Sequence, residues 1–305
     1  MKSMRDGLLL VDKEPGCTSH DVVQRVRRLL GQKKVGHCGT LDPDATGLLV
    51  LTLGRGTRLT RFLIRAPKAY AGVIRLGVAT DTYDAAGEVV ERRDTSQVTE
   101  EQVLTSMTQL EGKTEQKVPP YCAKKTQGVK YYELARKGAA TPETTKQVEI
   151  FEFRATGPLK DDRIPFLLRC STGTYARALA QEVGERVGCG AHLESLRRLQ
   201  VGPFRVENAL TLGVLEQKVA DPGDFGDSWI PFHHVPLPFP ELRADAQQER
   251  RIRHGQTVLA RGLEGDEGDW IRVTNQRQEL IAVGTVNEKI GESGVAIVRP
   301  RVVFN

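Results

Sequence analysis

A single carboxylate in a stiff segment is the first feature of this sequence that could do chemistry. Asp42 lies in the stretch VGHCGTLDPDATG, directly before Pro43. Proline fixes its own φ at about −65° and restricts the residue before it to extended geometry, so the backbone at Asp42 has little freedom. A nucleophile or a general base needs such fixed placement, because it must meet one substrate atom at near-attack distance. Asp42 is therefore the first candidate catalytic residue.

The second candidate is an arginine in an unusual position. The stretch TGTYARALAQEVGERVG predicts a helix that begins near Gly173 or Thr174, which places Arg177 in its first turn. A positive charge there opposes the helix dipole unless a carboxylate or a phosphate compensates it. We therefore expect an anionic partner for Arg177, and Asp42 is one candidate.

The positive charge of the chain is concentrated near Asp42. The 305 residues carry a formal net charge of +5. Residues 1–80 contain 14 Lys and Arg against 6 Asp and Glu, whereas residues 81–305 contain 30 against 33. A concentrated basic field favours an anionic partner, and the phosphates of nucleic acid are the commonest large one. The alternative is that these side chains form solvated helix faces.

Several classes of function find no support in the sequence. The 5 cysteines include no Cys-x-x-Cys pair, and the Cys-x-x-His at Cys189 and His192 lacks a second pair at zinc-finger spacing, so we expect neither disulfides nor a metal site. A P-loop and a dinucleotide fingerprint are both missing, so no motif of the sequence predicts a bound nucleotide. The sequence has no apolar run of about eighteen residues and no signal-peptide pattern, which predicts a cytoplasmic protein without a membrane segment.

Residue patterns predict alternating strands and helices up to about residue 200. Residues 7–13 read as an apolar strand, and residues 18–31 as a helix with a capping box at Thr18 and Asp21 and a glycine stop. A second helix opens at Thr99. Beyond a segment rich in Pro and Gly, short apolar pieces separated by turns predict a small β-domain; they are TVLARGL, DWIRVTN, LIAVGTV and VAIVRP.

The composition changes between Lys113 and Gly138. This stretch has 7 Lys and Arg, 2 Glu and 3 Tyr, with two consecutive prolines that interrupt regular structure. Interleaved cations and aromatic rings suit a loop that lies against RNA, where rings stack on bases and cations meet phosphates. An ordinary surface hairpin is the alternative.

Five segments, in order, resemble the TruB family of pseudouridine synthases, which act on uridine 55 of bacterial tRNA. They span residue 7 to about residue 199 and read DKEPGCTSHDVV, VGHCGTLDPDATGLLVL, KAYAGVIRLGVATDTYDAAG, VPPYCAKKTQGVKYYELARKG and RCSTGTYARALAQEVGERVGCGAHLESLRRL. Two departures from the family pattern occur. Glu14 stands between Lys13 and Pro15, where the family reads Asp-Lys-Pro, and the PPYCAKK segment is one residue shorter than usual.

The resemblance implies an α+β pseudouridine synthase fold with a mostly antiparallel central sheet and a small C-terminal β-rich domain of the PUA type. It implies a catalytic domain over residues 1–236, in which residues 113–150 form an RNA-clamping insertion, and a PUA-like RNA-binding domain over residues 237–305. The implied substrate is tRNA, bound through its T-arm by a monomer, with no cofactor and no metal.

The resemblance also implies roles for eight residues. Asp42 would be the catalytic carboxylate, paired with Arg177, with Asp84 as a second acid of that network. Tyr70 would stack on the target uracil and take part in removing the C5 proton. The remaining four would bind or support the substrate: His37 beside the everted base, Tyr175 and Leu196 along the uracil pocket, and Lys13 through its charge. Arg55, Arg58 and Arg61 would meet RNA phosphates.

Three other functions compete with a stand-alone synthase. The first is a synthase directed by a guide RNA, and the second is an RNA-folding chaperone whose catalysis is incidental. The third is a glycoside hydrolase that uses Asp42 and Asp44, although acids two residues apart around a proline have no assured separation. Within the synthase interpretation, Asp42 could attack C1′, attack C6, or act as a base toward a glycal.

Overall fold

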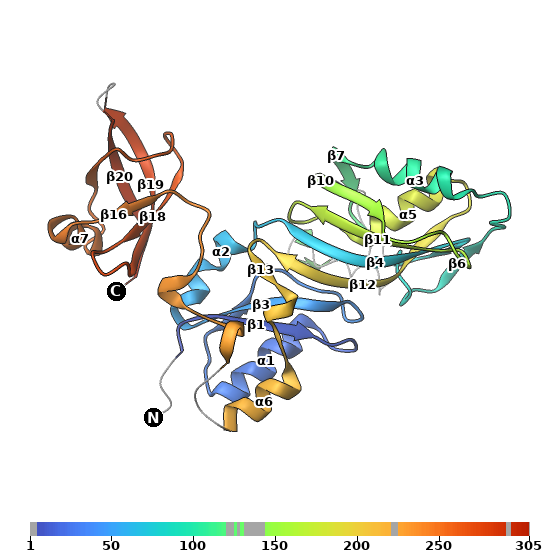
Figure 1. Cartoon of the computed structure of the whole chain (residues 1–305), viewed down its shortest axis with the longest axis horizontal. Coiled ribbons are helices and arrows are strands. Elements are labelled where there is room, and N and C mark those ends of the chain that lie inside the picture. Colours follow the sequence, from blue (N-terminus) through green and yellow to red (C-terminus); the bar gives the residue numbers. More distant parts are fainter. Residues whose placement is uncertain are drawn as a thin grey trace.

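The computed structural model describes residues 5–119, 125–126, 129–130, 144–220, 225–290 and 294–304. Its largest element is an eleven-stranded sheet with the order β14-β1-β3-β12-β4-β11-β10-β7, to which β13, β15 and β2 add at the sides (Figure 1). The strands of this sheet are β1 (Gly7–Lys13), β2 (Val35–His37), β3 (Thr46–Leu53), β4 (Lys68–Leu76), β7 (Gly112–Lys117), β10 (Thr145–Ala155), β11 (Arg163–Cys170), β12 (Ala191–Val201), β13 (Phe204–Arg205), β14 (Leu210–Thr211) and β15 (Trp229–Pro231).

The large sheet consists of two halves that meet over a very short join. Only the β1–β14 and β3–β12 pairs are parallel, so the predicted, mostly antiparallel sheet is confirmed. The β3–β12 pair covers two residues, with Gly47 opposite Arg198. Gly47 has a φ of +97°, and a Cβ there would lie 2.3 Å from the Arg198 carbonyl oxygen. The close approach of the two halves therefore depends on a glycine.

Five α-helices of the described residues pack against this sheet. They are α1 (Ser19–Leu30), α2 (Thr60–Leu63), α3 (Glu100–Thr108), α5 (Ala176–Arg186) and α6 (Leu212–Ala220). Helices α1 and α6 cover the half that contains β1 and β3, whereas α3 and α5 cover the half that contains β4 and β10 to β12 (Figure 1).

Helix α1 confirms the boundaries that the sequence predicted, and α5 corrects them. The capping box between Thr18 and Asp21 is formed, and Gly31 ends α1 with a φ of +62°. Helix α5 begins at Ala176, about one turn after the predicted start, because Gly173 has a φ of +86° and Tyr175 is extended. Arg177 still falls in the first turn.

Strand β1 is buried on both faces. Leu8 and Leu10 contribute to the core on the side of α2 and the C-terminal domain, whereas Leu9 and Val11 contribute to the core beneath α1 and α6. Successive side chains of a strand point to opposite faces, so a continuous apolar run is required where both faces are covered. The sequence GLLLVDK meets this requirement.

The C-terminal domain is a five-stranded sheet, β16-β18-β19-β20-β17, with one helix. Its elements are β16 (Glu241–Arg243), α7 (Ala246–Arg253), β17 (Val258–Arg261), β18 (Trp270–Thr274), β19 (Leu280–Ile290) and β20 (Val295–Val303). The predicted β-rich character is confirmed. Helix α7 was not predicted, because only Ile252 of its eight residues is buried and the segment shows no apolar stripe.

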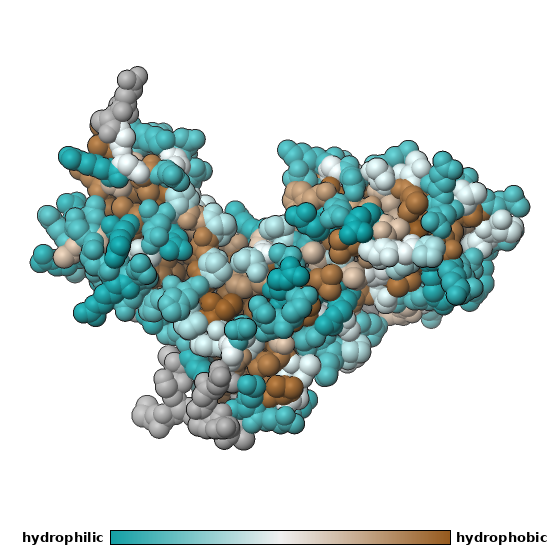
Figure 2. Space-filling model, in the orientation of Figure 1, coloured by the Kyte–Doolittle hydropathy of each residue, from teal (hydrophilic) through white to brown (hydrophobic). Residues whose placement is uncertain are grey.

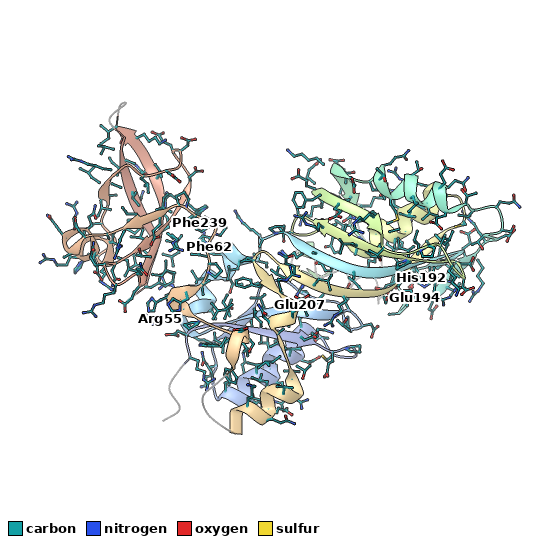
Figure 3. The ribbon with its side chains drawn as sticks, viewed as in Figure 1. Arg55, Phe62, His192, Glu194, Glu207 and Phe239 are labelled. Atoms are coloured by element: carbon teal, nitrogen blue, oxygen red, sulfur yellow. The ribbon has the colours of Figure 1, made fainter. Side chains whose placement is uncertain are left out.

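Aromatic rings join this domain to the helix α2. The centroid of the Phe62 ring lies 5.5 Å from that of Phe239 (Figure 3). It lies 4.9 Å from that of Trp270, and both pairs have edge-on geometry. Such pairs add to the stabilisation from buried area. The same apolar core includes Val283 and Val302 of the C-terminal sheet. The two sheets therefore share a packed interface.

Three arginines that were expected to meet RNA phosphates also contact the chain itself at or near this interface. Arg55 forms an ion pair with Asp6 at 2.7 Å, Arg58 donates a hydrogen bond to the Val303 carbonyl at 2.5 Å, and Arg61 lies over the Trp270 ring. The spacing of the three arginines in the sequence indicates a basic segment. It does not indicate that the C-terminal domain packs onto this segment.

The remaining pieces are small hairpins. Strands β5 (Val78–Thr80) and β6 (Val89–Arg92) pair with each other, as do β8 (Lys125–Thr126) and β9 (Val129–Lys130). More than half of the predicted RNA-clamping insertion, residues 113–150, lies outside the described residues. Strands β7 and β10, which contain its two ends, pair at the edge of the large sheet. Figure 2 shows a hydrophilic surface hollowed between the C-terminal domain and the far end of the large sheet. Within the described ranges, every helix is too short or too polar to cross a membrane.

Candidate active site

Five of the eight predicted site residues line one cavity of about 260 Å³. They are Asp42, Tyr70, Tyr175, Arg177 and Leu196. The cavity lies beside the join between the two halves of the large sheet, since Asp42 precedes β3 and Leu196 belongs to β12. Residues far apart in the sequence are thus brought together by the sheet order.

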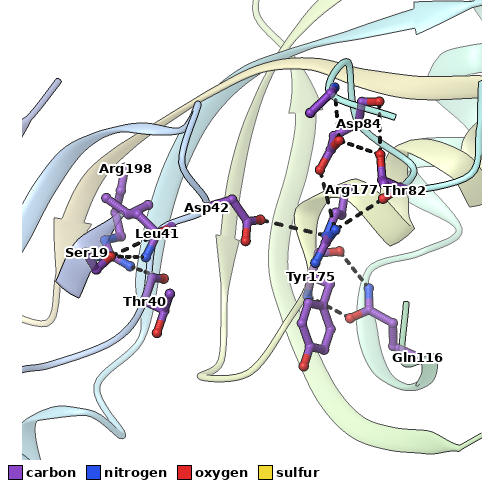
Figure 4. A network of polar contacts seen from close by, with 11 residues as sticks. Ser19, Thr40, Leu41, Asp42, Thr82, Asp84, Gln116, Tyr175, Arg177 and Arg198 are labelled. Atoms are coloured by element: carbon purple, nitrogen blue, oxygen red, sulfur yellow. Dashed lines mark hydrogen bonds and ion pairs between the residues drawn. The ribbon is translucent and has the colours of Figure 1, made fainter. Parts of the chain in front are cut away.

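Arg177 lies between two carboxylates at this cavity (Figure 4). Its Nε atom is 3.8 Å from Asp42 Oδ2, and one terminal nitrogen is 3.4 Å from Asp84 Oδ2. The Arg177 side chain is only 6% exposed, whereas that of Asp42 is 52% exposed. A buried guanidinium needs compensating negative charge, which explains why a cation is tolerated in the first turn of α5. The carboxylate of Asp42 stays open to the cavity.

Asp84 is fixed by its own loop. One oxygen of its carboxylate accepts hydrogen bonds from the Thr82 hydroxyl at 2.6 Å and from the Ala86 backbone at 3.1 Å. The loop is attached to β12, because the Ala85 N–H donates to the Leu193 carbonyl at 3.0 Å. Asp84 also lines a neighbouring cavity that shares Asp42. It therefore acts as a fixed acid behind Arg177.

The chain after Asp42 is held by a buried lysine. Lys13 is fully buried, and its ammonium donates hydrogen bonds to the carbonyls of Glu14, Pro43 and Ala45 at 2.9, 2.7 and 2.7 Å. Burial lowers the pKa of Lys13, against the raising effect of nearby groups that include Asp44 and Asp42. Lys13 thus lies under the Asp42 loop and supports it, and the unusual Glu14 supplies one of the acceptors through its backbone.

The chain before Asp42 is held by an arginine and a serine. Arg198 is 1% exposed, and its guanidinium donates to the carbonyls of Leu48, Gly39 and Thr40 at 2.7, 3.0 and 3.3 Å. The Ser19 hydroxyl accepts a hydrogen bond from the Leu41 N–H at 2.8 Å. Together with Lys13, these contacts fix the backbone on both sides of Asp42, which Pro43 alone would not do.

Tyr70 and Lys68 line the cavity from the same face of β4. Burial raises the pKa of Tyr70, so its phenol is neutral at neutral pH. Burial and, secondarily, the charge of Arg198 lower the pKa of Lys68 to about 8. The Lys68 amine donates to the carbonyls of Ile64 and Ala66 at 2.6 and 2.7 Å.

Lys68 and Arg198 are cavity residues that the sequence analysis missed. Lys68 could have been found from its spacing, since it lies two residues before Tyr70 on a predicted strand and so shares its face. No local signal marks Arg198, because its partners are backbone carbonyls of a distant segment.

His37 lies apart from the cavity. It belongs to β2, opposite Leu51 of β3, and it lines neither of the two cavities that contain Asp42. Burial lowers the pKa of His37, so the neutral imidazole is favoured. Its predicted role beside an everted base stays a prediction.

Across the residues that the structure describes, no group of three or more His, Cys, Asp or Glu side chains is placed to hold a metal ion. The four described cysteines are free thiols. Cys38 and Cys170 are buried near the cavity, and burial raises the pKa of the Cys38 thiol to about 12. These thiols are inert core groups at neutral pH.

The fold defines a class of protein. The structure superposes on the solved "Structure of H/ACA RNP bound to a substrate RNA containing 2'-deoxyuridine" with a TM-score of 0.76 and 22% identity, covering 99% of this chain and 86% of that one. It matches a Cbf5-Nop10-Gar1 complex with a TM-score of 0.75 and 24% identity, covering 98% and 85%. The chain therefore shares the fold of these two structures.

Sequence comparison gives the family. The pattern of the TruB family pseudouridylate synthase N-terminal domain matches residues 27–176, and that of the tRNA pseudouridylate synthase B C-terminal domain matches residues 177–225. The chain belongs to the TruB family of pseudouridylate synthases. Three relatives are each named tRNA pseudouridine synthase B. That of Solibacter usitatus is 38% identical over 92% of this chain and 96% of its own, that of Geotalea uraniireducens 44% over 74% and 72%, and that of Thermobifida fusca 40% over 87% and 90%.

Proposed function

We propose that this chain isomerises uridine to pseudouridine in the T-loop of tRNA, at position 55, without a cofactor. The names of its relatives support the substrate class. One structural observation carries the proposal: Asp42 is open to a cavity, its backbone is fixed on both sides, and Arg177 links it to Asp84.

The reaction conserves all atoms of the uridine. The bond from C1′ to N1 breaks, the uracil turns, a bond from C1′ to C5 forms, the C5 proton leaves, and N1 gains a proton. The protein must provide a placed carboxylate, a pocket for the everted base and a proton acceptor. Asp42 supplies the carboxylate, whether it attacks C1′, attacks C6 or takes a proton on the way to a glycal.

The cavity residues divide the other tasks. Leu196 and the rings of Tyr70 and Tyr175 form a wall of the size and apolar character that a uracil ring needs. The Tyr70 ring stacks on the base. Burial raises the pKa of its phenol, so Tyr70 is neutral and can accept the C5 proton only if a neighbouring base or the charge of Arg198 helps to ionise it. Lys68 and Arg198 line the same cavity and place buried positive charge beside it, which favours an anionic substrate such as RNA.

We propose further that the protein acts as a cytoplasmic monomer that grips the T-arm. Residues 113–150 would clamp the RNA, and residues 237–305 would form a PUA-like RNA-binding domain next to a catalytic domain of residues 1–236. The second sheet begins at Glu241, which is compatible with this division.

A guide-directed synthase is the second candidate, because the structural neighbours include H/ACA and Cbf5 complexes. The two candidates differ in what they need. A stand-alone enzyme acts on tRNA by itself, whereas a guided one requires a second RNA. An RNA chaperone would differ from both, since it would keep its cellular phenotype with Asp42→Asn.

Tritium release tests the proposal. A tRNA transcript labelled with tritium at uracil C5 is incubated either with the wild type or with Asp42→Asn. No guide RNA is present in either reaction. A second transcript carries cytidine in place of the T-loop target uridine. We expect release that requires both Asp42 and the target uridine. No release from folded wild-type protein on tRNA alone would overturn the proposal.

A further inference from the structure

Tyr175 is the point at which the cavity wall meets the start of α5. It is the N-cap residue of α5, and its own side chain forms no capping hydrogen bond. Its backbone carbonyl accepts from the N–H groups of Ala178 and Leu179 at 3.1 and 3.3 Å, as the first acceptor of the helix. The conformation of Tyr175 therefore sets where α5 begins, and with it the position of Arg177 two residues later.

A glutamine from another strand binds both backbone polar groups of Tyr175 (Figure 4). The Gln116 side-chain oxygen accepts from the Tyr175 N–H at 2.8 Å, and the Gln116 amide donates to the Tyr175 carbonyl at 3.1 Å. Gln116 is 2% exposed. The side-chain amide of glutamine carries a donor and an acceptor side by side, so it can bind the backbone N–H and the backbone carbonyl of one residue at the same time. An ionised aspartate or glutamate lacks the donor, and lysine lacks the acceptor.

The segment before Tyr175 is held by other elements. Ser171 exchanges hydrogen bonds with Glu149 of β10, and the Thr172 hydroxyl donates to the Ile64 carbonyl at 2.8 Å. Gln116 adds a contact from β7, and Val118, on the same face of the chain two residues later, packs against Tyr175. Strand β7 and the residue that follows it thus contact the cavity wall at Tyr175, through the polar side chain of Gln116 and the apolar side chain of Val118.

We propose that Gln116 is a positioning residue for the reaction: its amide fixes the backbone of Tyr175 and thereby sets the place of the Arg177 guanidinium against Asp42. This inference rests on the proposed function for its kinetic part. Gln116 touches neither Asp42 nor the cavity itself. It also lies near the start of the predicted RNA-clamping insertion of residues 113–150, so the strand that opens this insertion contacts the cavity wall.

Two substitutions separate positioning from general stability. Gln116→Leu keeps the approximate shape and removes both hydrogen bonds. Gln116→Glu keeps the acceptor for the Tyr175 N–H, but an ionised carboxylate repels the Tyr175 carbonyl. Protonation restores a donor, and burial favours the protonated acid. Activity lost in Gln116→Glu should therefore return as the pH falls, relative to the wild type at each pH, which a merely structural defect would not show.

The test measures single-turnover pseudouridine formation at saturating tRNA between pH 6 and 8. We expect Gln116→Leu to lower the rate constant by about 10- to 100-fold, the range that a misplacement of about 1 Å can cause, with tRNA affinity within about threefold. We expect Gln116→Glu to recover about tenfold toward pH 6. The matched controls are Gln109→Leu and Gln109→Glu, on the exposed end of α3, which should stay within about twofold.

Hydrogen exchange gives a readout that needs no activity. In Gln116→Leu, exchange in a peptide that covers residues 172–178 should accelerate about tenfold or more, because the Tyr175 N–H loses its acceptor. Unchanged exchange there would overturn the proposal, as would rate constants within twofold of the wild type or a loss that disappears at saturating tRNA. An inactive wild type would refute the proposed function instead, and exchange would still decide the role of Gln116.

Discussion

Replacing Arg177 by lysine tests the central ion-pair network. Lysine keeps the charge but presents one compact ammonium in place of a planar group with several donors. Arg177 now reaches Asp42 with Nε and Asp84 with a terminal nitrogen, at 3.8 and 3.4 Å, and it also donates to the Thr82 carbonyl at 3.3 Å. A single ammonium cannot occupy both positions, so one carboxylate loses its close partner.

The magnitude follows from the distances. Two unit charges about 4 Å apart attract by roughly 4 kcal/mol at an effective dielectric constant of about 20. A retreat of about 2 Å removes a third of this, or roughly 1.4 kcal/mol, which corresponds to about tenfold in rate. Solvent screening at the half-exposed Asp42 reduces the electrostatic part, while loss of alignment adds to the total. We expect Arg177→Lys to lower the turnover number by about 10- to 100-fold.

The assay is the turnover number on tRNA at saturation, together with a urea unfolding curve. We expect the unfolding midpoint to stay close to that of the wild type, because the charge is retained. Arg186→Lys is the matched control, since Arg186 ends the same helix, is exposed, and pairs with Glu182 at 2.9 Å. It should leave the turnover unchanged. Near wild-type turnover in Arg177→Lys would remove Arg177 from the catalytic network.

Three further predictions concern the supports of the site. Lys13→Met should lower the free energy of unfolding by about 2–4 kcal/mol in urea titrations, because three carbonyl groups lose a charged donor; a change below about 0.5 kcal/mol would contradict the role of Lys13. Burial lowers the pKa of Lys68 from 10.5 to about 8 in the folded chain. Above pH 8 the Lys68 amine therefore binds a proton in the unfolded chain but largely not in the folded one. The free energy of unfolding of the wild type should thus rise by about 1–2 kcal/mol from pH 7.5 to 9.5, relative to that of Lys68→Met. A fall over this range would contradict a lowered pKa of Lys68. Replacing residues 121–141 by a short Gly-Ser linker should weaken tRNA binding at least about tenfold. The unfolding midpoint should stay unchanged, because the Val118 N–H donates to the Thr144 carbonyl and already holds the two ends of the replaced segment close together. Unchanged tRNA affinity would contradict the clamping role.

Local signals carried the parts of the fold that could be predicted. The capping box at Thr18 and the glycine stop at Gly31 act within one helix, so the sequence contains all of their information. The approach of Asp42 to Arg177 followed from a charge that lacked a local partner. In both cases a residue type and its position imply a definite physical requirement.

Contacts to distant backbone could not be predicted in this way. Arg198 and Gln116 bind main-chain carbonyls or N–H groups of segments far along the chain. Every residue offers such groups, so no sequence pattern marks the acceptor. The interface that occupies Arg58 and Arg61 was missed for a similar reason, because it depends on how two sheets pack.

Because the Asp42 loop is held by hydrogen bonds to its main chain, its side chains can change over evolutionary time without loss of these contacts. Lys13 and Arg198 contact carbonyl oxygens, and these oxygens are present whatever side chain a loop position carries. Sequence drift at Thr40 or Asp44 can therefore alter the surroundings of the cavity without moving the Asp42 carboxylate. The anchoring cations have no such freedom. Engineering of substrate preference would begin with the loop side chains and leave the two cations in place.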